Sequence, residues 1–209
     1  MDQKKLIKMI QDHQPTPLGI SNNRKYAVIL PIIEKDDELH IVFEIRSKHM
    51  RRQPGEVCFP GGKVDQNDLN TAETATRELC EELGVNEDQL YNLEYLGLLV
   101  TPFGLSVSAY TGFINLDVDQ SFDPNPFEVE SIFTVPLSFF LEHDPEVHYI
   151  NIDIKPDDNF PYEDIPNGES YEWQKLQYEE HFYYYDNQVI WGLTARILKD
   201  FVSIIKGDQ

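Results

Sequence analysis

Three glutamates in one short stretch of the chain are spaced for metal chemistry. Glu78 and Glu82 are four residues apart and Glu81 lies between them, so on a helix all three share one side. Like charges placed this way repel one another and destabilise a helix unless something offsets them. Carboxylate oxygens suit hard divalent cations such as Mg2+ or Mn2+, and such a cation neutralises phosphate charge and activates water. A solvated acidic helix face is the alternative interpretation.

A pair of glycines stands upstream of these glutamates. Gly61 and Gly62 directly follow Phe59-Pro60, and their lack of Cβ atoms lets a ligand approach the backbone closely. A glycine-rich loop that leads into a helix bearing carboxylates can hold a metal and a pyrophosphate together. An ordinary turn is the alternative. Gly61 and Gly62 are therefore candidate substrate-binding residues.

The element that must position the glutamates is a helix from about residue 71 to 83. Asn70 and Glu73 form a plausible capping pair at its start, and Gly84 ends it. Apolar residues recur at helical spacing and predict its buried stripe: Ala72, Ala75, Leu79, Cys80 and Leu83.

Apolar patterns elsewhere predict a mixed fold in a single domain spanning 1–209. The expected helices are 3–12, 136–143 and 189–206, and the expected strands are 26–33, 39–46, 93–100, 106–115, 128–135, 147–154 and 178–186. Residues 47–70 form a long loop, which in a compact domain is usually functional. This order indicates an α+β or α/β sandwich.

Composition limits the classes of function. The chain has 209 residues, 41% of them hydrophobic, and a net charge of −20. So acidic a surface repels nucleic acid and anionic membranes over most of its area, so neither is an expected partner. The N-terminus has no apolar region ending in small residues, so a cytoplasmic location is expected. The two cysteines, Cys58 and Cys80, are expected to be buried reduced thiols.

The stretch from Gly62 to Val85 resembles the Nudix box, whose usual form is G-x5-E-x7-R-E-U-x-E-E-x-G-U, where U is apolar. Its second half matches at every fixed position from Arg77 onward. The first half departs, because Gly62 stands fifteen residues before Arg77, one more than the usual spacing. The upstream glutamate is absent, and counting from the two ends places Leu69 or Asp68 there. The partner of Arg77 is therefore left open.

This departure from the usual box resembles the pattern of one branch of the family, the coenzyme A pyrophosphatases. That branch has a longer Gly-Gly-x-x-Asp-x-x-Asp entry, which here runs from Gly61 to Asp68. It also has an upstream motif, R-S-x3-R-x3-G-x3-F-P-G-G, which residues 46–62 match at every fixed position. The resemblance covers roughly residues 26–205. It implies an α/β/α sandwich around a mixed sheet, with the Nudix box at 62–85.

The resemblance also implies roles for individual residues. Glu78 and Glu82 bind the essential Mg2+ or Mn2+, and Glu81 is a further ligand or the base that acts on water. Arg77 positions the carboxylates of the helix rather than touching substrate.

Two further features concern the substrate. Arg46 and Arg51 belong to the one basic cluster of an acidic chain, with Arg52 beside them, and arginine grips phosphate with paired donors. The alternative is that these arginines pair with nearby acids. Phe103 lies in a predicted loop, where it can stack on adenine, pack against a pantetheine arm or close the edge of the core.

The function expected from these residues and the resemblance is hydrolysis of the pyrophosphate bond of coenzyme A, giving 3′,5′-ADP and 4′-phosphopantetheine. Another nucleoside diphosphate derivative, such as ADP-ribose or a dinucleotide, is an alternative substrate, and so is an oxidised nucleotide. A binding module with this fold but without catalysis is a further alternative, against which the intact glutamates argue. A homodimer is compatible with this function.

Overall fold

A mixed sheet forms the centre of the molecule in the computed structural model, which describes residues 2–13, 16–116 and 121–208. Its strands are β1 (Arg24–Lys35), β2 (Glu38–Arg46), β3 (Val57–Cys58), β4 (Gly61–Lys63), β5 (Leu90–Val100), β6 (Leu105–Ile114) and β7 (Val129–Pro136). The order is β3-β2-β1-β6-β5, with β4 paired to β1 and β7 to β2. The pair β1–β6 is parallel, whereas the other pairs in this sheet are antiparallel.

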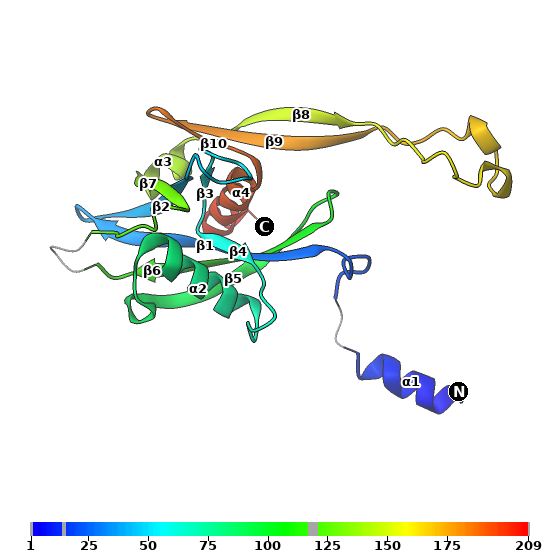
Figure 1. Ribbon diagram of the computed structural model, residues 1–209, viewed down its shortest axis with the longest axis horizontal. Helices are drawn as coiled ribbons and strands as arrows, with labels where there is room; N and C mark the ends of the chain where they lie inside the picture. Colours follow the sequence, from blue (N-terminus) through cyan, green and yellow to red (C-terminus); the bar gives the residue numbers. More distant parts are fainter. Residues whose placement is uncertain (1, 14–15, 117–120, 209) are drawn as a thin grey trace.

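Helices cover both faces of this sheet (Figure 1). Alternate residues of β1 point to opposite sides: Ala27 and Ile29 join one buried cluster with α2 (Thr71–Leu83), while Leu30 joins another with α4 (Gly192–Lys206). The short helix α3 (Leu137–Glu142) packs on the same side as α4. The expected α/β/α sandwich around a mixed sheet is confirmed.

Helix α2 begins and ends where its sequence signals predict. The Asn70 side chain accepts hydrogen bonds from the backbone N–H groups of Ala72 and Glu73, at 2.9 and 3.0 Å, and such caps contribute about 1 kcal/mol. Gly84 ends the helix with a left-handed φ of 68°, which glycine adopts without steric cost. Leu79 and Leu83 are fully buried against the sheet, and they hold α2 on it.

A second, three-stranded sheet extends away from the sandwich. It contains β8 (Glu146–Ile152), β9 (Leu176–Tyr185) and β10 (Gln188–Ile190), in the order β10-β9-β8. Figure 1 shows β8 and β9 as a long hairpin whose outer end carries the turn-rich segment 153–175. The base of β9 packs on the body, because the ring of Tyr183 meets the buried Phe140 edge-on with ring centres 5.2 Å apart.

The structure corrects two expectations about secondary structure. Gly61 and Gly62 belong to strand β4, paired with Val28 and Ala27, so 47–70 is not one continuous loop. The last helix begins at Gly192 rather than at 189, because Gln188–Ile190 pair with β9 as strand β10. The first helix, α1 (Gln3–Gln11), forms close to its expected bounds and has no buried residue. Among the described residues, no helix is long and apolar enough to cross a membrane.

Candidate active site

A cavity of about 830 Å³ lies where the sequence motifs of the chain meet. Its walls come from β1, β2, β4, α2, the β5–β6 loop, β9 and the start of α4. Four cationic side chains line it: Arg24, Arg46, Arg52 and Lys63. The carboxylates of Glu78 and Glu82 line it as well. The fold therefore gathers the acidic helix, both glycines and part of the basic cluster in one place.

The two glycines determine how closely α2 approaches β4. The backbone N–H of Gly61 donates a hydrogen bond of 2.8 Å to Glu82 Oε2, which fixes a carboxylate that is only 4% exposed. A Cβ on Gly62 would lie 2.3 Å from the carboxyl carbon of Glu78, far inside any real contact. Gly62 is thus required by the position of Glu78, an interpretation that the sequence alone did not separate from an ordinary turn.

Arg77 connects the box helix to the loop before it. Its Nε and Nη2 atoms donate hydrogen bonds of 3.3 Å to the carboxylate of Asp68. The same guanidinium lies 2.9 Å from Glu78 Oε1 and 3.2 Å from Glu81 Oε2. Asp68 is therefore the partner that the sequence left open, and it fills the place of the missing glutamate. The hydrogen bond from Arg77, with further bonds from Asp65 N–H and Thr74, lowers the pKa of Asp68 to about 2.

Buried negative charge accumulates on the sheet side of α2. Burial raises the pKa of Glu82, and the neighbouring charge of Glu44 raises it further. Burial likewise raises the pKa of Glu44 and of Glu78. Glu44 is fully buried on β2, and its Oε2 atom has no hydrogen-bond partner among the described residues. Glu44 therefore lacks the strong donors that a buried charge requires.

A bound divalent cation would neutralise these buried carboxylates, and carboxylate oxygens are the ligands that hard cations prefer. Within the described ranges, no group of three or more His, Cys, Asp or Glu side chains is arranged to hold a metal ion. The reason lies in the contacts above: Glu78 and Glu81 face Arg77, and Glu82 accepts from Gly61. The donor set fits a divalent cation in its chemistry and requires rotation of the Glu78 side chain.

The expected substrate residues divide into two groups. Arg46, Gly61, Gly62 and Phe103 line the cavity. Arg51 does not, and its neighbour Arg52, which is also exposed, lines the cavity instead. The segment from 47 to 55 folds into successive turns, closed by the Gly55 N–H to Arg46 carbonyl hydrogen bond. In successive turns the side chains do not point in regularly repeating directions, as they do in a helix or a strand. The sequence therefore does not show whether Arg51 or Arg52 faces the cavity.

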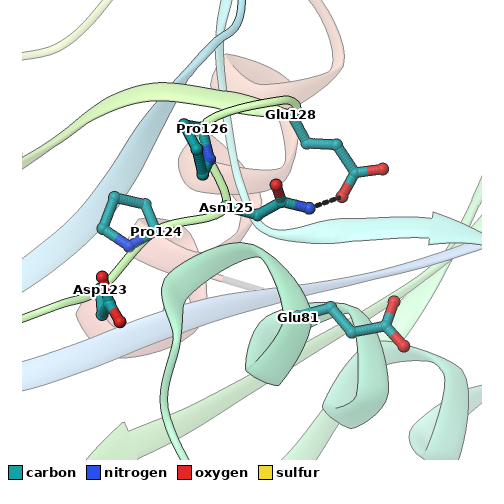
Figure 2. A pocket seen from close by; sticks show the side chains of 6 residues that line it. All are labelled: Glu81, Asp123, Pro124, Asn125, Pro126 and Glu128. Carbon is teal, nitrogen blue, oxygen red and sulfur yellow. Dashed lines mark hydrogen bonds between the residues drawn. The ribbon is translucent and has the colours of Figure 1, made fainter.

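Glu81 lies outside the large cavity. It lines a separate, more open depression of about 530 Å³ together with residues 123–126 and Glu128. Figure 2 shows Glu81 on the helix and the other five residues on the segment that passes above it. In that segment the Asn125 side chain donates a 3.1 Å hydrogen bond to Glu128 Oε2. Glu128 lines both the cavity and the depression, so the two are neighbours.

Several cavity residues were not predicted from the sequence. Tyr178 and Trp191 line the cavity. The Tyr178 ring lies edge-on to Phe103, with ring centres 5.4 Å apart, and carries the Arg196 guanidinium 4.4 Å above it. The burial of Glu44 had one signal in the sequence: it is a lone acid within the apolar strand segment HIVFEIR.

Comparison with known proteins places this architecture in a family. The family model described as the NUDIX domain matches residues 23–152. The mouse protein named peroxisomal coenzyme A diphosphatase NUDT7 is 38% identical over 128 residues, which are 61% of this chain and 52% of the mouse protein. A Nudix hydrolase NudL of Photorhabdus laumondii is 34% identical over 193 residues, covering 92% of this chain and 91% of its own.

The fold is shared with solved structures as well. The crystal structure of a MutT/nudix family protein from Enterococcus faecalis aligns with a TM-score of 0.54 at 14% sequence identity, covering 99% of this chain and 70% of that one. That identity supports likeness of fold alone. Taken with the box helix, the Asp68–Arg77 contact and the matches in sequence, these comparisons show that the chain belongs to the Nudix hydrolase family.

Proposed function

We propose that this Nudix pyrophosphohydrolase acts on coenzyme A or its acyl derivatives, with Mg2+ or Mn2+, and releases 3′,5′-ADP and 4′-phosphopantetheine. Membership of the family accounts for divalent-metal-dependent hydrolysis of nucleoside diphosphate derivatives. The choice of coenzyme A is carried by one observation: a single cavity joins the acidic pair of α2, a set of cations and an apolar aromatic wall.

The cationic side supports binding of a polyanion. Arg46, Arg52 and Lys63 line the cavity in a protein whose net charge is −20. Coenzyme A carries a pyrophosphate and a 3′-phosphate, and arginine binds phosphate oxygens through paired charge-assisted hydrogen bonds. Within an acidic surface, such a local patch also concentrates anionic substrate at one entrance.

The apolar side supports binding of the rest of the molecule. Phe103, Tyr178 and Trp191 line the cavity together with Leu193, and Trp191 remains 38% exposed. Aromatic walls suit both adenine and the hydrophobic stretches of a pantetheine arm. Tyr178, Trp191 and Leu193 lie outside residues 23–152, the range matched by the family model, so the C-terminal part of the chain adds most of this wall to Phe103.

The residues have distinct roles in the proposed reaction. Glu78 and Glu82 hold the cation, which supplies charge neutralisation at the pyrophosphate and activation of water when bound. Water attacks one phosphorus, the bridging P–O bond breaks, and the bridging oxygen leaves with the other phosphate. Arg46 and Arg52 bind phosphate oxygens and stabilise the negative charge that develops. Glu81 is the proposed base or further ligand, and it must leave Arg77 to reach the cavity.

The name of the mouse relative supports the same choice, since that protein is described as a coenzyme A diphosphatase. The decisive experiment incubates the purified full chain with Mg2+ or Mn2+ and, separately, coenzyme A, an acyl-coenzyme A, ADP-ribose, NADH and oxidised dGTP. Products are identified by mass. We expect the largest kcat/KM on coenzyme A or the acyl form. Faster hydrolysis of ADP-ribose or of oxidised dGTP would contradict the substrate assignment while leaving the pyrophosphohydrolase class intact.

A further inference from the structure

The most unusual charged group in the molecule is the carboxylate of Glu44. It is 0% exposed in the middle of β2. Its Oε1 atom accepts a hydrogen bond of 3.1 Å from the Cys58 thiol, and Oε2 has no partner in the described part of the chain. A thiol is a weak donor, and a buried carboxylate without strong donors is costly. The fold retains this group although a neutral side chain would remove the cost.

The surroundings of Glu44 increase the cost. The charged groups that interact with it are Arg46, Glu128, Glu78 and, through the reciprocal effect, Glu82. Arg46 is the one cation in this set. Glu78 is also paired with Arg77, but that guanidinium is shared with Asp68 and Glu81. Carboxylates therefore outnumber cations around Glu44.

Glu44 lies close to the wall of the cavity as well as in the protein core. Cys58, its hydrogen-bond donor and its cross-strand partner in the β2–β3 register, lines the cavity. Three residues further along, Gly61 N–H holds Glu82 Oε2. Glu44 itself does not line the cavity. It thus lies behind the cavity wall, where its charge interacts with Glu82, the carboxylate that is proposed to face the cation.

We infer that Glu44 is a positioning residue of the cation site, whose buried charge acts through Glu82 to strengthen divalent-cation binding. The cation held by Glu78 and Glu82 supplies the positive charge that Glu44 lacks within the protein. This inference rests on the proposed metal role of Glu78 and Glu82. Two effects follow: Glu44 raises the affinity for the cation, and it destabilises the protein when the cation is withheld.

The test measures Mn2+ binding to the full chain without substrate, by electron paramagnetic resonance. Glu44→Gln keeps the size of the side chain and an acceptor for the Cys58 thiol while removing the charge. We expect the Mn2+ dissociation constant to rise about tenfold, as for other residues that support metal ligands. Glu34→Gln, on an exposed position at the end of β1, is the matched control and leaves the constant unchanged. Glu44→Asp, which keeps the charge, retains most of the affinity.

Thermal melting distinguishes this role from ordinary packing. Without metal, with EDTA present, Glu44→Gln melts at the wild-type temperature or above it, whereas added Mn2+ raises its melting temperature less than that of the wild type. A variant that melts lower by the same amount with and without Mn2+ contradicts the inference. If Glu44→Gln does not fold, strong Mn2+ binding by Glu44→Asp supports it and loss of binding by that variant overturns it.

The variant Glu82→Gln distinguishes a failure of the inference about Glu44 from a failure of the metal assignment. If Glu82→Gln weakens Mn2+ binding and Glu44→Gln changes it less than twofold, the inference about Glu44 is wrong and the metal assignment stands. If neither variant weakens binding, both are wrong. In the double variant, the effect of Glu44→Gln should shrink, because substitutions of coupled residues that act on one ion are not additive.

Discussion

The guanidinium of Arg77 donates two hydrogen bonds of 3.3 Å to the carboxylate of Asp68, nine residues earlier in the chain. This contact joins the end of the loop before α2 to the helix that carries Glu78 and Glu82. Because the box has one extra residue before the helix, an aspartate reaches from the loop to the place where a glutamate usually stands. The contact thus restores the expected interaction with a shorter side chain.

Asp68→Asn should destabilise the protein near neutral pH and lose that effect in acid. The pKa of Asp68 is lowered from 3.8 to about 2 in the folded state, so its contribution is complete above the unfolded value and disappears as the pH falls through the folded value. Urea unfolding of wild type and variant at pH 6, 4 and 3 checks this. We expect the difference between their midpoints to narrow from pH 4 to pH 3. Asp153→Asn, at an exposed position, serves as the control, and equal midpoints at pH 6 would contradict the role.

Removal of the charge from either proposed metal ligand should abolish most turnover. Glu78→Gln and Glu82→Gln each should lower kcat by about 100-fold or more, the scale of losing one charge-stabilising group at a reaction centre. In Glu82→Gln the new amide oxygen would still accept the Gly61 N–H, so circular dichroism and melting temperature should stay near wild type. Retention of full kcat by both variants would refute the metal assignment.

Gly62→Ala should damage catalysis by displacing Glu78. The added methyl group would lie 2.3 Å from the Glu78 carboxyl carbon, and this side chain must move away. We expect kcat to fall about tenfold or more, since small displacements of a positioned group carry costs of this size. In a Glu78→Ala background the methyl group has room, so Gly62→Ala should add little further loss. Equal losses in both backgrounds would place the effect elsewhere.

The two neighbouring arginines provide a matched pair for substrate binding. Arg52 lines the cavity and Arg51 does not, so Arg52→Ala should lower kcat/KM for coenzyme A by about tenfold, the scale of one charge-assisted hydrogen bond. Arg51→Ala should change it less than Arg52→Ala. Steady-state kinetics on coenzyme A and 3′-dephospho-coenzyme A would show whether Arg52 reads the 3′-phosphate. A larger loss from Arg51→Ala would reverse the assignment.

The aromatic wall should act on KM more than on kcat. Trp191→Ala removes a ring that lines the cavity and stacks on Phe182 with centres 5.8 Å apart. We expect KM for coenzyme A to rise about tenfold, because a buried aromatic contact is worth about 1–2 kcal/mol, while ADP-ribose is affected less. Phe127→Ala, at an aromatic residue that is 81% exposed and absent from the cavity wall, is the control. Equal increases on both substrates would argue against contact with the pantetheine arm.

The parts of the fold predicted correctly are those set by local sequence. Helix α2 has a cap at Asn70, an apolar stripe and a stop at Gly84, and each acts within a few residues. Strand β4 was missed because glycine has little strand propensity and its pairing with Ala27 and Val28 comes from far along the chain. Val189 and Ile190 of strand β10 were predicted as the start of the last helix, but their pairing with the neighbouring strand β9 decides their conformation.

The residues of the site also fall into those that local sequence predicts and those that it does not. The spacing of Glu78 and Glu82 on one helix is visible in the sequence, and both line the cavity. The inward turn of Arg52 depends on the conformation of residues 47–55, and the environment of Glu44 depends on β3 and α2 packing on β2. Periodicity describes neither, because the first depends on irregular turns and the second on contacts between segments distant in sequence.

The parallel pairing of β1 with β6 has a consequence for the order of folding. Arg24 pairs with Leu105 and Ile32 with Phe113, so the middle of the sheet closes only when segments about 80 residues apart meet. Closing so large a loop costs entropy before any contact repays it. The pairing also completes the floor on which α2 packs and the cavity wall that Val28 shares with Val107. We therefore expect the cavity to be completed in the same slow folding step that pairs β1 with β6. A partly folded form without this pairing should not bind substrate.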